Sequence, residues 1–238
     1  MKTLLEKQKM STCLLLSDTH GFHSKLLLPE EKIDLILHAG DLTMAGKEDE
    51  VFSFLYWAEA VVQKYSAPLI FIPGNHDFYF EKKRPNLPEN VHCLINEKLE
   101  LNIQNKIHSI YGFPQQPIFG GWAFNLDDSP RKQLLMQAEK DYQRKDYNIF
   151  LTHGPPNMIL DRTYDGRNVG CGYLASHASK YYYDLIVFGH IHEGRGMLQK
   201  KSKHTNVFTT YVNASICNYP HYSKLRDPIV LNLEELKE

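Results

Sequence analysis

Paired cysteines, long apolar runs and an excess of charge of one sign are all missing from this sequence of 238 residues. Its four cysteines are scattered without a C-x-x-C pair, so nothing indicates a zinc ribbon or a disulfide framework: Cys13, Cys93, Cys171 and Cys217. Lys and Arg number 27 against 28 Asp and Glu, which gives no broad basic field for non-specific binding to nucleic acid. No apolar stretch approaches the length that crosses a bilayer. The composition therefore favours neither nucleic acid nor a membrane as a partner.

The beginning of the sequence lacks the pattern of an export signal. Residues 1–20 contain only short apolar runs, interrupted by Glu6, Lys7 and Lys9, which the apolar core of a signal peptide does not tolerate. Together with the unpaired cysteines, this favours a soluble protein of the reducing cytoplasm. The length and the hydrophobic content of 42% suit one large α/β domain, and no repeat or long linker divides the chain. We expect a single domain over residues 1–238, while no pattern specifies an oligomeric state.

Five short apolar runs predict buried strands, because they are rich in Leu, Ile, Val and Phe and are bounded by turn residues. They are CLLLS, DLILHAG, PLIFIPG, NIFLTHG and DLIVFGH. Helical periodicity predicts helices over 48–65, over 129–145 with Ser129 as the cap and Pro130 in the first turn, and over roughly 172–182. Residues 91–113 suggest antiparallel strands joined by a tight turn at 104–106, and FTTYVNAS and PIVLNLE suggest closing strands.

Polar side chains that can bind metal follow each of the five runs. They are Asp18 and His20, Asp41, Asn75 and His76, His153, and finally His190 and His192. In open α/β sheets the ligand site lies beyond the carboxyl ends of the strands, where loops from several strands converge. We therefore expect these side chains to meet in space. Carboxylate, amide and imidazole ligands without a thiolate suit Mn²⁺, Fe or Zn²⁺ bound for catalysis rather than a structural zinc site.

Each of these signals also has an ordinary structural explanation. A strand-end Asp is often a turn former or a helix cap, and an interior His is often a hydrogen-bonded core residue. The ordered set SDTH, GDLT, GNHD, THGPP and GHIH is more specific, because all its parts fall at strand ends. A glycine precedes Asp41, Asn75 and His190, and this favours sharp turns and a close approach of the backbone to the ions.

This ordered set, spanning Asp18 to His192, resembles the signature of the calcineurin-like metallophosphoesterase superfamily. Its spacing also resembles the small phosphodiesterase branch that includes the animal metallophosphoesterase-domain-containing proteins. The residues that carry this narrower resemblance are Gly120–Leu126, Thr152–Pro156, Val169–Cys171, His190–Gly194 and Asn213–Ser215. The resemblance implies a four-layer α-β-β-α sandwich with two mixed β-sheets and a dinuclear metal site at the carboxyl ends of the strands.

The resemblance also implies a role for each matching residue. Asp18, His20, Asp41 and His192 would bind a first divalent ion, and Asp41 would bridge to a second ion completed by Asn75, His153 and His190. Some animal members carry Gly at the position of His190, whereas this chain keeps His, so its second ion position should be complete. His76 would act on the substrate as a general acid or as a phosphate-stabilising cation. Asp77 would orient His76, or alternatively cap a helix.

These roles predict hydrolysis of a small phosphodiester, with a hydroxide that bridges the two ions attacking phosphorus directly. No G-x-S-x-G sequence suggests a serine nucleophile instead. Manganese is the metal expected to support activity in vitro, with iron or zinc as alternatives. The rival functions are a phosphomonoesterase or protein phosphatase on the same core, and a metal protein that binds nucleotides without turnover.

The substrate pocket is less defined by sequence. Arg167 and Arg195 lie near the last two motifs and could contact phosphate oxygens, although a loop arginine is often simply solvated. Trp122, Phe124 and Tyr173 could stack on a nucleobase, but we favour the core for them. A nucleotide or cyclic nucleotide substrate rests mainly on the resemblance.

Overall fold

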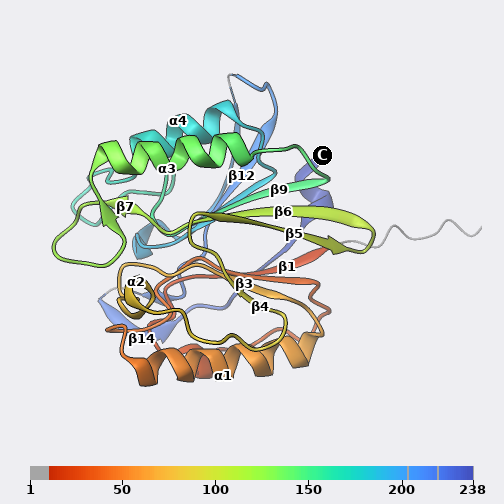
Figure 1. The fold of residues 1–238 in the computed structure, drawn as a ribbon, viewed down its shortest axis with the longest axis vertical. Coiled ribbons are helices and arrows are strands. Elements are labelled where there is room, and N and C mark those ends of the chain that lie inside the picture. The colour runs from red at the N-terminus through yellow and green to blue at the C-terminus, as the bar shows by residue number, and fades with distance from the viewer. Residues whose placement is uncertain (1–10, 203, 219, 238) are drawn as a thin grey trace, which may run out of the picture.

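A computed structural model describes residues 11–202, 204–218 and 220–237, so half of the segment considered for an export signal lies outside the described residues. Four layers follow one another in the order helix, sheet, sheet, helix (Figure 1). This is the predicted α-β-β-α sandwich with two mixed sheets, and the fold class is therefore confirmed.

The first sheet has five strands in the order β15-β1-β2-β3-β4. Its strands are β1 (Thr12–Leu16), β2 (Leu35–His38), β3 (Leu69–Phe71), β4 (Val91–Cys93) and β15 (Ile229–Asn232). Strands β1 to β4 are parallel, and β15 pairs antiparallel with β1 at the edge. Three of the five predicted runs thus form neighbouring strands whose carboxyl ends point the same way.

The second sheet has six strands in the order β11-β12-β10-β9-β6-β5. Its strands are β5 (Glu97–Ile103), β6 (Lys106–Phe113), β9 (Tyr147–Thr152), β10 (Leu185–Phe188), β11 (Gly196–Lys201) and β12 (Phe208–Asn213). The predicted hairpin is confirmed, since β5 and β6 are antiparallel. Its two turn residues, Gln104 and Asn105, both have positive φ angles (53° and 63°), as a tight hairpin turn requires. Two small ribbons, β7 (Gln116–Pro117) with β8 (Asn125–Leu126) and β13 (Cys217–Asn218) with β14 (His221–Leu225), flank the main sheets.

Helices cover the outer faces of both sheets (Figure 1). They are α1 (Glu48–Tyr65), the short α2 (Tyr79–Lys82), α3 (Asp128–Asp141) and α4 (Gly172–Lys180), with 3-10 turns at His23–Lys25, His192–Gly194 and Leu233–Lys237. The prediction of α1 is confirmed at both ends. The prediction of Ser129 as the cap of α3 was wrong, because the N-cap is Asp127. Pro130 does lie in the first turn, as predicted. Helices α3 and α4 end before the predicted residues because Tyr142 and Tyr181 take extended backbone at their C-caps, where the two rings pack together.

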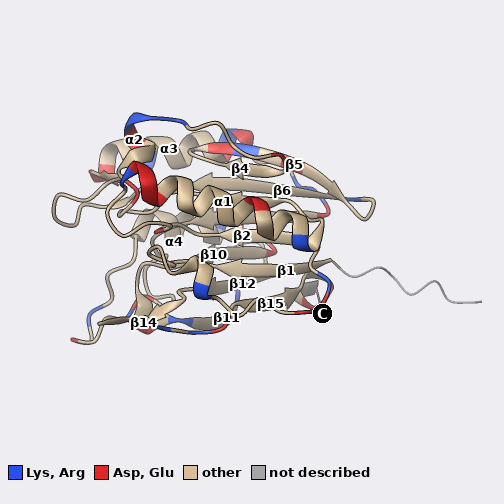
Figure 2. Cartoon of the chain, turned by 90° about the horizontal axis from the view of Figure 1, so that it is seen from below, with Lys and Arg blue, Asp and Glu red and all other residues tan. Residues whose placement is uncertain are grey.

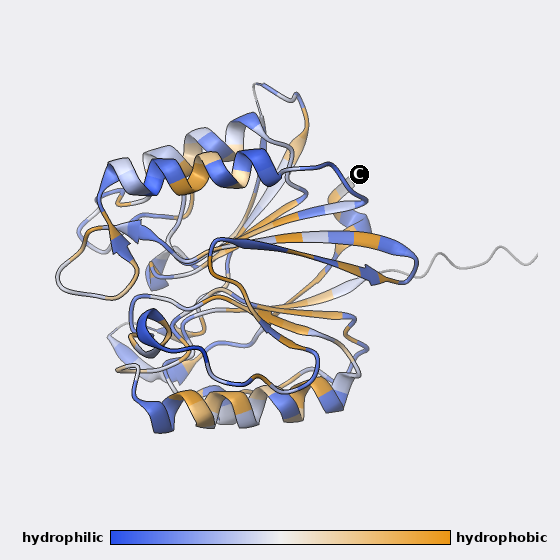
Figure 3. Ribbon diagram, in the orientation of Figure 1, coloured by the Kyte–Doolittle hydropathy of each residue, from blue (hydrophilic) through white to orange (hydrophobic). Residues whose placement is uncertain are grey.

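Alternating side chains along the buried strands explain the layers. In β1, Cys13 and Leu15 join the core between the two sheets, whereas Leu14 and Leu16 pack with α1. Successive side chains of a strand point to opposite faces, so a strand buried on both faces is apolar throughout. Hydrophobic residues accordingly line the strands in Figure 3. Acidic and basic residues are interspersed on the ribbon seen from below (Figure 2).

Candidate metal centre

The seven predicted ligands follow the strands as expected: Asp18 after β1, Asp41 after β2, Asn75 after β3, His153 after β9, and His190 and His192 after β10, with His20 two residues beyond Asp18. Six of the seven lie, with His76, in three overlapping groups of carboxylate and imidazole side chains. The groups are Asp18 with His20 and His192, His20 with Asp41 and His76, and Asp41 with His153 and His190. In each group the potential ligand atoms lie within 4.8 Å of one another.

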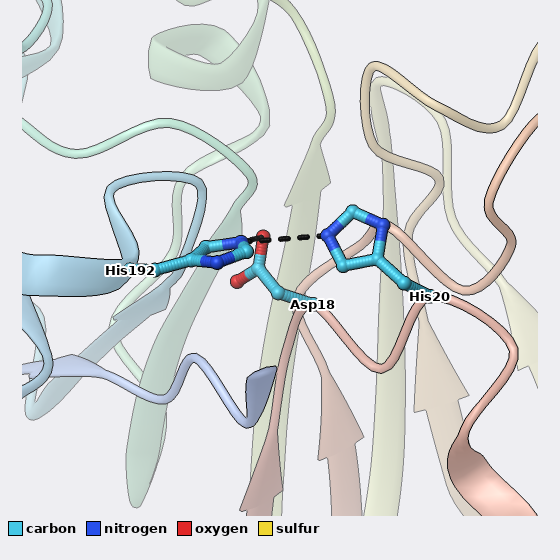
Figure 4. A group of neighbouring side chains, drawn as sticks. All are labelled: Asp18, His20 and His192. Carbon is cyan, nitrogen blue, oxygen red and sulfur yellow. Dashed lines mark hydrogen bonds and ion pairs between the residues drawn. The ribbon is translucent and has the colours of Figure 1, made fainter. Parts of the chain in front are cut away.

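The first group converges on a small volume between the ends of the two sheets (Figure 4). His192 Nε2 lies 3.2 Å from Asp18 Oδ1 and 3.4 Å from His20 Nε2. His20 Nε2 also lies 3.7 Å from Asp41 Oδ2. All four side chains are buried, and their nitrogen and oxygen atoms face one another rather than solvent.

We call Asp41, Asn75, His153 and His190 the second group, and its Asp41 also faces His20 of the first group. His153 Nε2 lies 3.4 Å from Asp41 Oδ1 and 2.9 Å from Asn75 Oδ1. The two oxygens of Asp41 are thus directed to different histidines, Oδ2 to His20 and Oδ1 to His153. This is the arrangement that a carboxylate shared between two cations needs. The contact with His153 also places Asn75, a ligand predicted from the sequence, at the site.

The ligands sit on unusual backbone. Asp18, His20, Asp41 and His190 all have positive φ angles, of 53°, 43°, 54° and 65°. Such conformations cost of order 1–3 kcal/mol each in residues other than glycine and cluster at functional sites. Gly40 shares this left-handed conformation, with a φ of 96°, as the sequence suggested.

Two other glycines are needed for space rather than for conformation. A Cβ on Gly74 would collide with Asp41 Oδ1, and a Cβ on Gly189 would collide with Asp18 Oδ2. Both glycines therefore let the backbone of one strand end approach the carboxylate of another.

Charge within the site favours a cation. Burial alone would raise the pKa of Asp18 and of Asp41, but neighbouring histidines, chiefly His192 and His153 respectively, hold both well below the ordinary value. Within the described part of the chain, the ion pairs of these two carboxylates involve histidines and neither Lys nor Arg. Buried carboxylates require a positive partner, and the surrounding nitrogen and oxygen donors fit divalent cations.

The histidines differ in charge. Burial lowers the pKa of His20 to about 4, and burial together with His153 lowers that of His190 to about 3. For His153, burial opposes protonation, but Asp41 and Asp18 outweigh it and raise the pKa to about 9. A cation bound here would therefore displace the proton of His153, because only a neutral imidazole ligates metal.

His76 lies beside the ligands, but Asp77 does not orient it. His76 Nδ1 lies 2.6 Å from the carbonyl oxygen of Met44, while its ring contacts that of His20 at 4.6 Å between centroids. The Asp77 carboxylate is fully buried and accepts hydrogen bonds from Leu42, Thr43 and Gly74. The structure thus corrects the expected partnership. Asp77 joins the loop after β2 to the loop after β3.

The three aromatic residues assigned to the core separate in the structure. Phe124 is buried, as predicted, whereas Trp122 and Tyr173 are 36% and 37% exposed, so the core assignment was wrong for these two. The Trp122 ring lies 4.2 Å from that of His76 between centroids, at an interplanar angle of 32°. Trp122 therefore lies over His76 at the edge of the site.

Both arginines that were considered for phosphate contacts have partners within the protein. The Arg167 side chain is exposed to solvent, and its Nε lies 2.6 Å from Asp165 Oδ2. Arg195 donates to the carbonyl oxygens of Ser215 and Asp227, at 2.8 and 2.6 Å. Its guanidinium group joins segments of the backbone beside the site.

Two residues near the ligands were not identified from sequence as parts of the site. The Ser215 hydroxyl donates to Asp18 Oδ2 at 2.8 Å, and the Tyr222 ring lies 4.9 Å from that of His20. Asn213–Ser215 carried the resemblance to the phosphodiesterase branch, which was a usable signal for Ser215. No pattern in the sequence distinguishes Tyr222 from the other 13 tyrosines.

Among the residues that the structure describes, no helix combines the length and apolarity that crossing a bilayer demands.

Known proteins with similar sequences identify the family of this chain. Metallophosphoesterase domain-containing protein 1 of Homo sapiens and of Mus musculus is 34% identical over 241 residues, covering 91% of this chain and 69% of the relative. UPF0046 protein K07C11.7 of Caenorhabditis elegans is 29% identical over 227 residues, covering 90% and 72%. One solved structure shares the fold, with a TM-score of 0.63 at 12% identity over 95% of this chain and 96% of that one. Residues 12–194 match the description Calcineurin-like phosphoesterase, and the chain belongs to that family.

Proposed function

We propose that this protein is a hydrolase of small phosphodiesters that works with two divalent cations. Family membership supports a phosphoesterase, and the sharing of Asp41 between two groups of histidines carries the two-ion proposal. One ion would be held by Asp18, His20, Asp41 and His192, and the other by Asp41, Asn75, His153 and His190. Cations in such a pair supply Lewis acidity and activate water at neutral pH.

His76 is proposed to deliver the proton that the departing oxygen requires. The Met44 carbonyl can only accept a hydrogen bond, so His76 Nδ1 carries a hydrogen and Nε2 is left to exchange a proton with the substrate. When the bond between phosphorus and the leaving oxygen breaks, protonated Nε2 gives its hydrogen to that oxygen. Trp122 limits the freedom of the His76 ring by lying over it, and shields it from water.

Trp122 also supports the choice of substrate. A partly exposed indole beside the proposed proton donor offers a flat apolar surface to the leaving group. Every nucleobase has a face that can stack on such a ring, at about 1–3 kcal/mol per base. We therefore propose nucleotides or cyclic nucleotides as substrates. Four free cysteines and a ligand set without thiolates fit a reducing cytoplasm and Mn²⁺, Fe or Zn²⁺ as the ions.

The test is a comparison of substrates on protein reconstituted with Mn²⁺. We expect kcat/KM to be higher for a bis-aryl phosphodiester than for the corresponding aryl monoester, with turnover of 2′,3′- or 3′,5′-cyclic nucleotides. A preference for the monoester would replace the diesterase by a phosphomonoesterase. Full occupancy by two ions without turnover of any ester would instead indicate a binding protein.

Asp41→Asn should lower kcat/KM by roughly 10³-fold or more. Losing about 4 kcal/mol of charge stabilisation has this effect, since each 1.36 kcal/mol is tenfold. Asp49→Asn is a matched control, because Asp49 is exposed on α1. Unchanged turnover by Asp41→Asn at saturating Mn²⁺ would exclude a bridging role.

A further inference from the structure

The segment that follows β12 touches the first group of ligands at several points. We call residues 213–218 and 221–226 the C-terminal clamp. Its Ser215 is fully buried, and the hydroxyl lies 2.8 Å from Asp18 Oδ2 and 2.7 Å from Asn213 Oδ1. Asp18 Oδ1, the other oxygen of the same carboxylate, faces His192. Ser215 therefore restrains the rotation of the Asp18 carboxylate together with the His190 N–H, which lies 3.1 Å from Oδ1 and 3.0 Å from Oδ2.

Tyr222 of the clamp fixes the two histidines of the same group. Its ring lies 4.9 Å from that of His20 and 5.5 Å from that of His192, at interplanar angles of 90° and 80°. Edge-to-face contacts of this kind are favourable and directional. One tyrosine thus restrains both imidazoles.

The clamp also restrains the backbone of this group. Arg226 Nη1 donates to the carbonyl oxygen of His192 at 3.0 Å, and Cys217 N donates to that of Asp18 at 3.2 Å. Asp18, His20 and His192 are therefore each contacted by the clamp.

The second group is held by a different part of the chain. His153 Nδ1 donates to the carbonyl oxygen of Ala39 at 2.9 Å, and Gly189 N donates to that of His153 at 3.0 Å. The Asn75 carbonyl accepts from Ala123 N at 3.0 Å. All these partners lie within residues 12–194, the range that matches the family, whereas the clamp lies beyond it. The clamp also contacts the loop that carries both His190 and His192, because Asn213 Nδ2 donates to the carbonyl oxygen of Ile191 and Ala214 N donates to that of Phe188.

We propose that the C-terminal clamp is an outer shell dedicated to the first ion position, with Ser215 as the positioning residue that holds Asp18. The two ion positions then depend on different parts of the chain, and disturbing the clamp releases one ion while the other stays. The inference rests on the two-ion site of the proposed function. Partners that orient metal ligands typically contribute 10- to 100-fold to metal affinity.

The test is titration of the metal-free full chain with Mn²⁺ alone, followed by counting the ions retained per chain. Ser215→Ala should weaken one of the two dissociation constants by roughly 10- to 100-fold and leave the other unchanged. Tyr222→Ala should act in the same direction and Tyr222→Phe much less, because Phe keeps the ring. Ser223→Ala is the matched control, since Ser223 is exposed on β14. Ser215→Thr keeps a hydroxyl and should restore part of the affinity.

Two double variants identify the position that loses its ion. They are compared at a Mn²⁺ concentration where Ser215→Ala retains one ion. Adding His20→Ala should leave that ion in place, and adding His153→Ala should remove it. The reverse pattern would overturn the inference, as would equal weakening of both ions or none by Ser215→Ala and Tyr222→Ala.

Metal-free thermal melts show whether each variant folds. If Ser215→Ala does not fold, the test relies on Tyr222→Ala, whose side chain is only half-buried. A wild-type chain that binds only one ion would overturn the two-ion function together with the clamp. A wild-type chain that binds two ions, with variants that lose both or neither, would overturn the clamp alone. The titration needs no turnover, so a wrong choice of substrate does not affect it.

Discussion

Asp77→Asn tests whether the carboxylate between two loops is a structural acceptor or a partner of His76. Asp77 Oδ1 accepts from Thr43 N at 3.0 Å and Thr43 Oγ1 at 2.6 Å. Asp77 Oδ2 accepts from Leu42 N at 3.1 Å and Gly74 N at 2.7 Å. An Asn side chain can place its oxygen on one side only. With that oxygen facing Leu42 N and Gly74 N, its NH₂ group would face the Thr43 hydroxyl, which can accept, and Thr43 N, which would lose its acceptor.

The cost follows from these contacts. A buried donor left without an acceptor costs about 1–3 kcal/mol, so the loss at Thr43 N lowers the free energy of unfolding by that amount. That is a measurable part of the roughly 5–15 kcal/mol typical of a folded protein. Affinity for metal should fall as well, because Asp41 and Asn75 are adjacent in sequence to Leu42 and Gly74.

The assay is urea unfolding of the metal-free protein with a chelator at pH 8. Burial and the nearby charge of Asp41 raise the pKa of Asp77 to about 6, so the wild-type carboxyl is ionised under these conditions. Asp49→Asn is again the matched control and should unfold with the wild type. If Asp77→Asn kept the wild-type stability and lost only kcat, Asp77 would act on His76 and the structural reasoning would be refuted.

Three further predictions concern the site itself. His76→Ala should lower kcat by about 10²- to 10⁴-fold on a cyclic nucleotide and less on an activated aryl diester, whose leaving group needs no proton. Equal losses of kcat on both substrates would indicate that His76 stabilises charge, and loss of a bound ion would make His76 a ligand. Gly189→Ala should remove the first ion, because its Cβ would collide with the Asp18 carboxylate, whereas Gly121→Ala meets nothing within 4 Å and should match the wild type in ion content by elemental analysis. Mn²⁺ affinity should rise with pH until about 9, where His153 loses its proton; titrations that give one affinity from pH 7 to 9 would contradict that protonation.

The sequence predicted the strands well because they depend on local pattern. Apolar runs of four or five residues bounded by turn residues became β1, β2, β9 and β10, and the periodicity over 48–65 became α1. The helix ends near Tyr142 and Tyr181 were missed; both residues take extended backbone there, and their rings lie 5.2 Å apart between centroids. Tertiary packing overrides local preference most readily at the ends of elements.

Side-chain partners across the fold were the main failures of the sequence reasoning. Asp77 follows His76 directly, which suggested a pair, but its carboxylate reaches the loop after β2 instead. Arg195 lies close to His192 in sequence, yet its guanidinium group binds backbone carbonyls. Neighbours in sequence say little about the direction of long or strand-end side chains, because the direction depends on which other loops are present.

By itself, the sequence determined that carboxylates, an amide and imidazoles follow buried strands, and this predicts a ligand site because the loops beyond the carboxyl ends of such strands converge. Only the tertiary structure decided which atoms face each other. It directs the two oxygens of Asp41 to different histidines, and it brings Ser215 and Tyr222 to Asp18 and His20 from about 200 residues away. Contacts at such separations have no local signature, since they arise when β12 and the ribbon β13–β14 pack beside the end of β1.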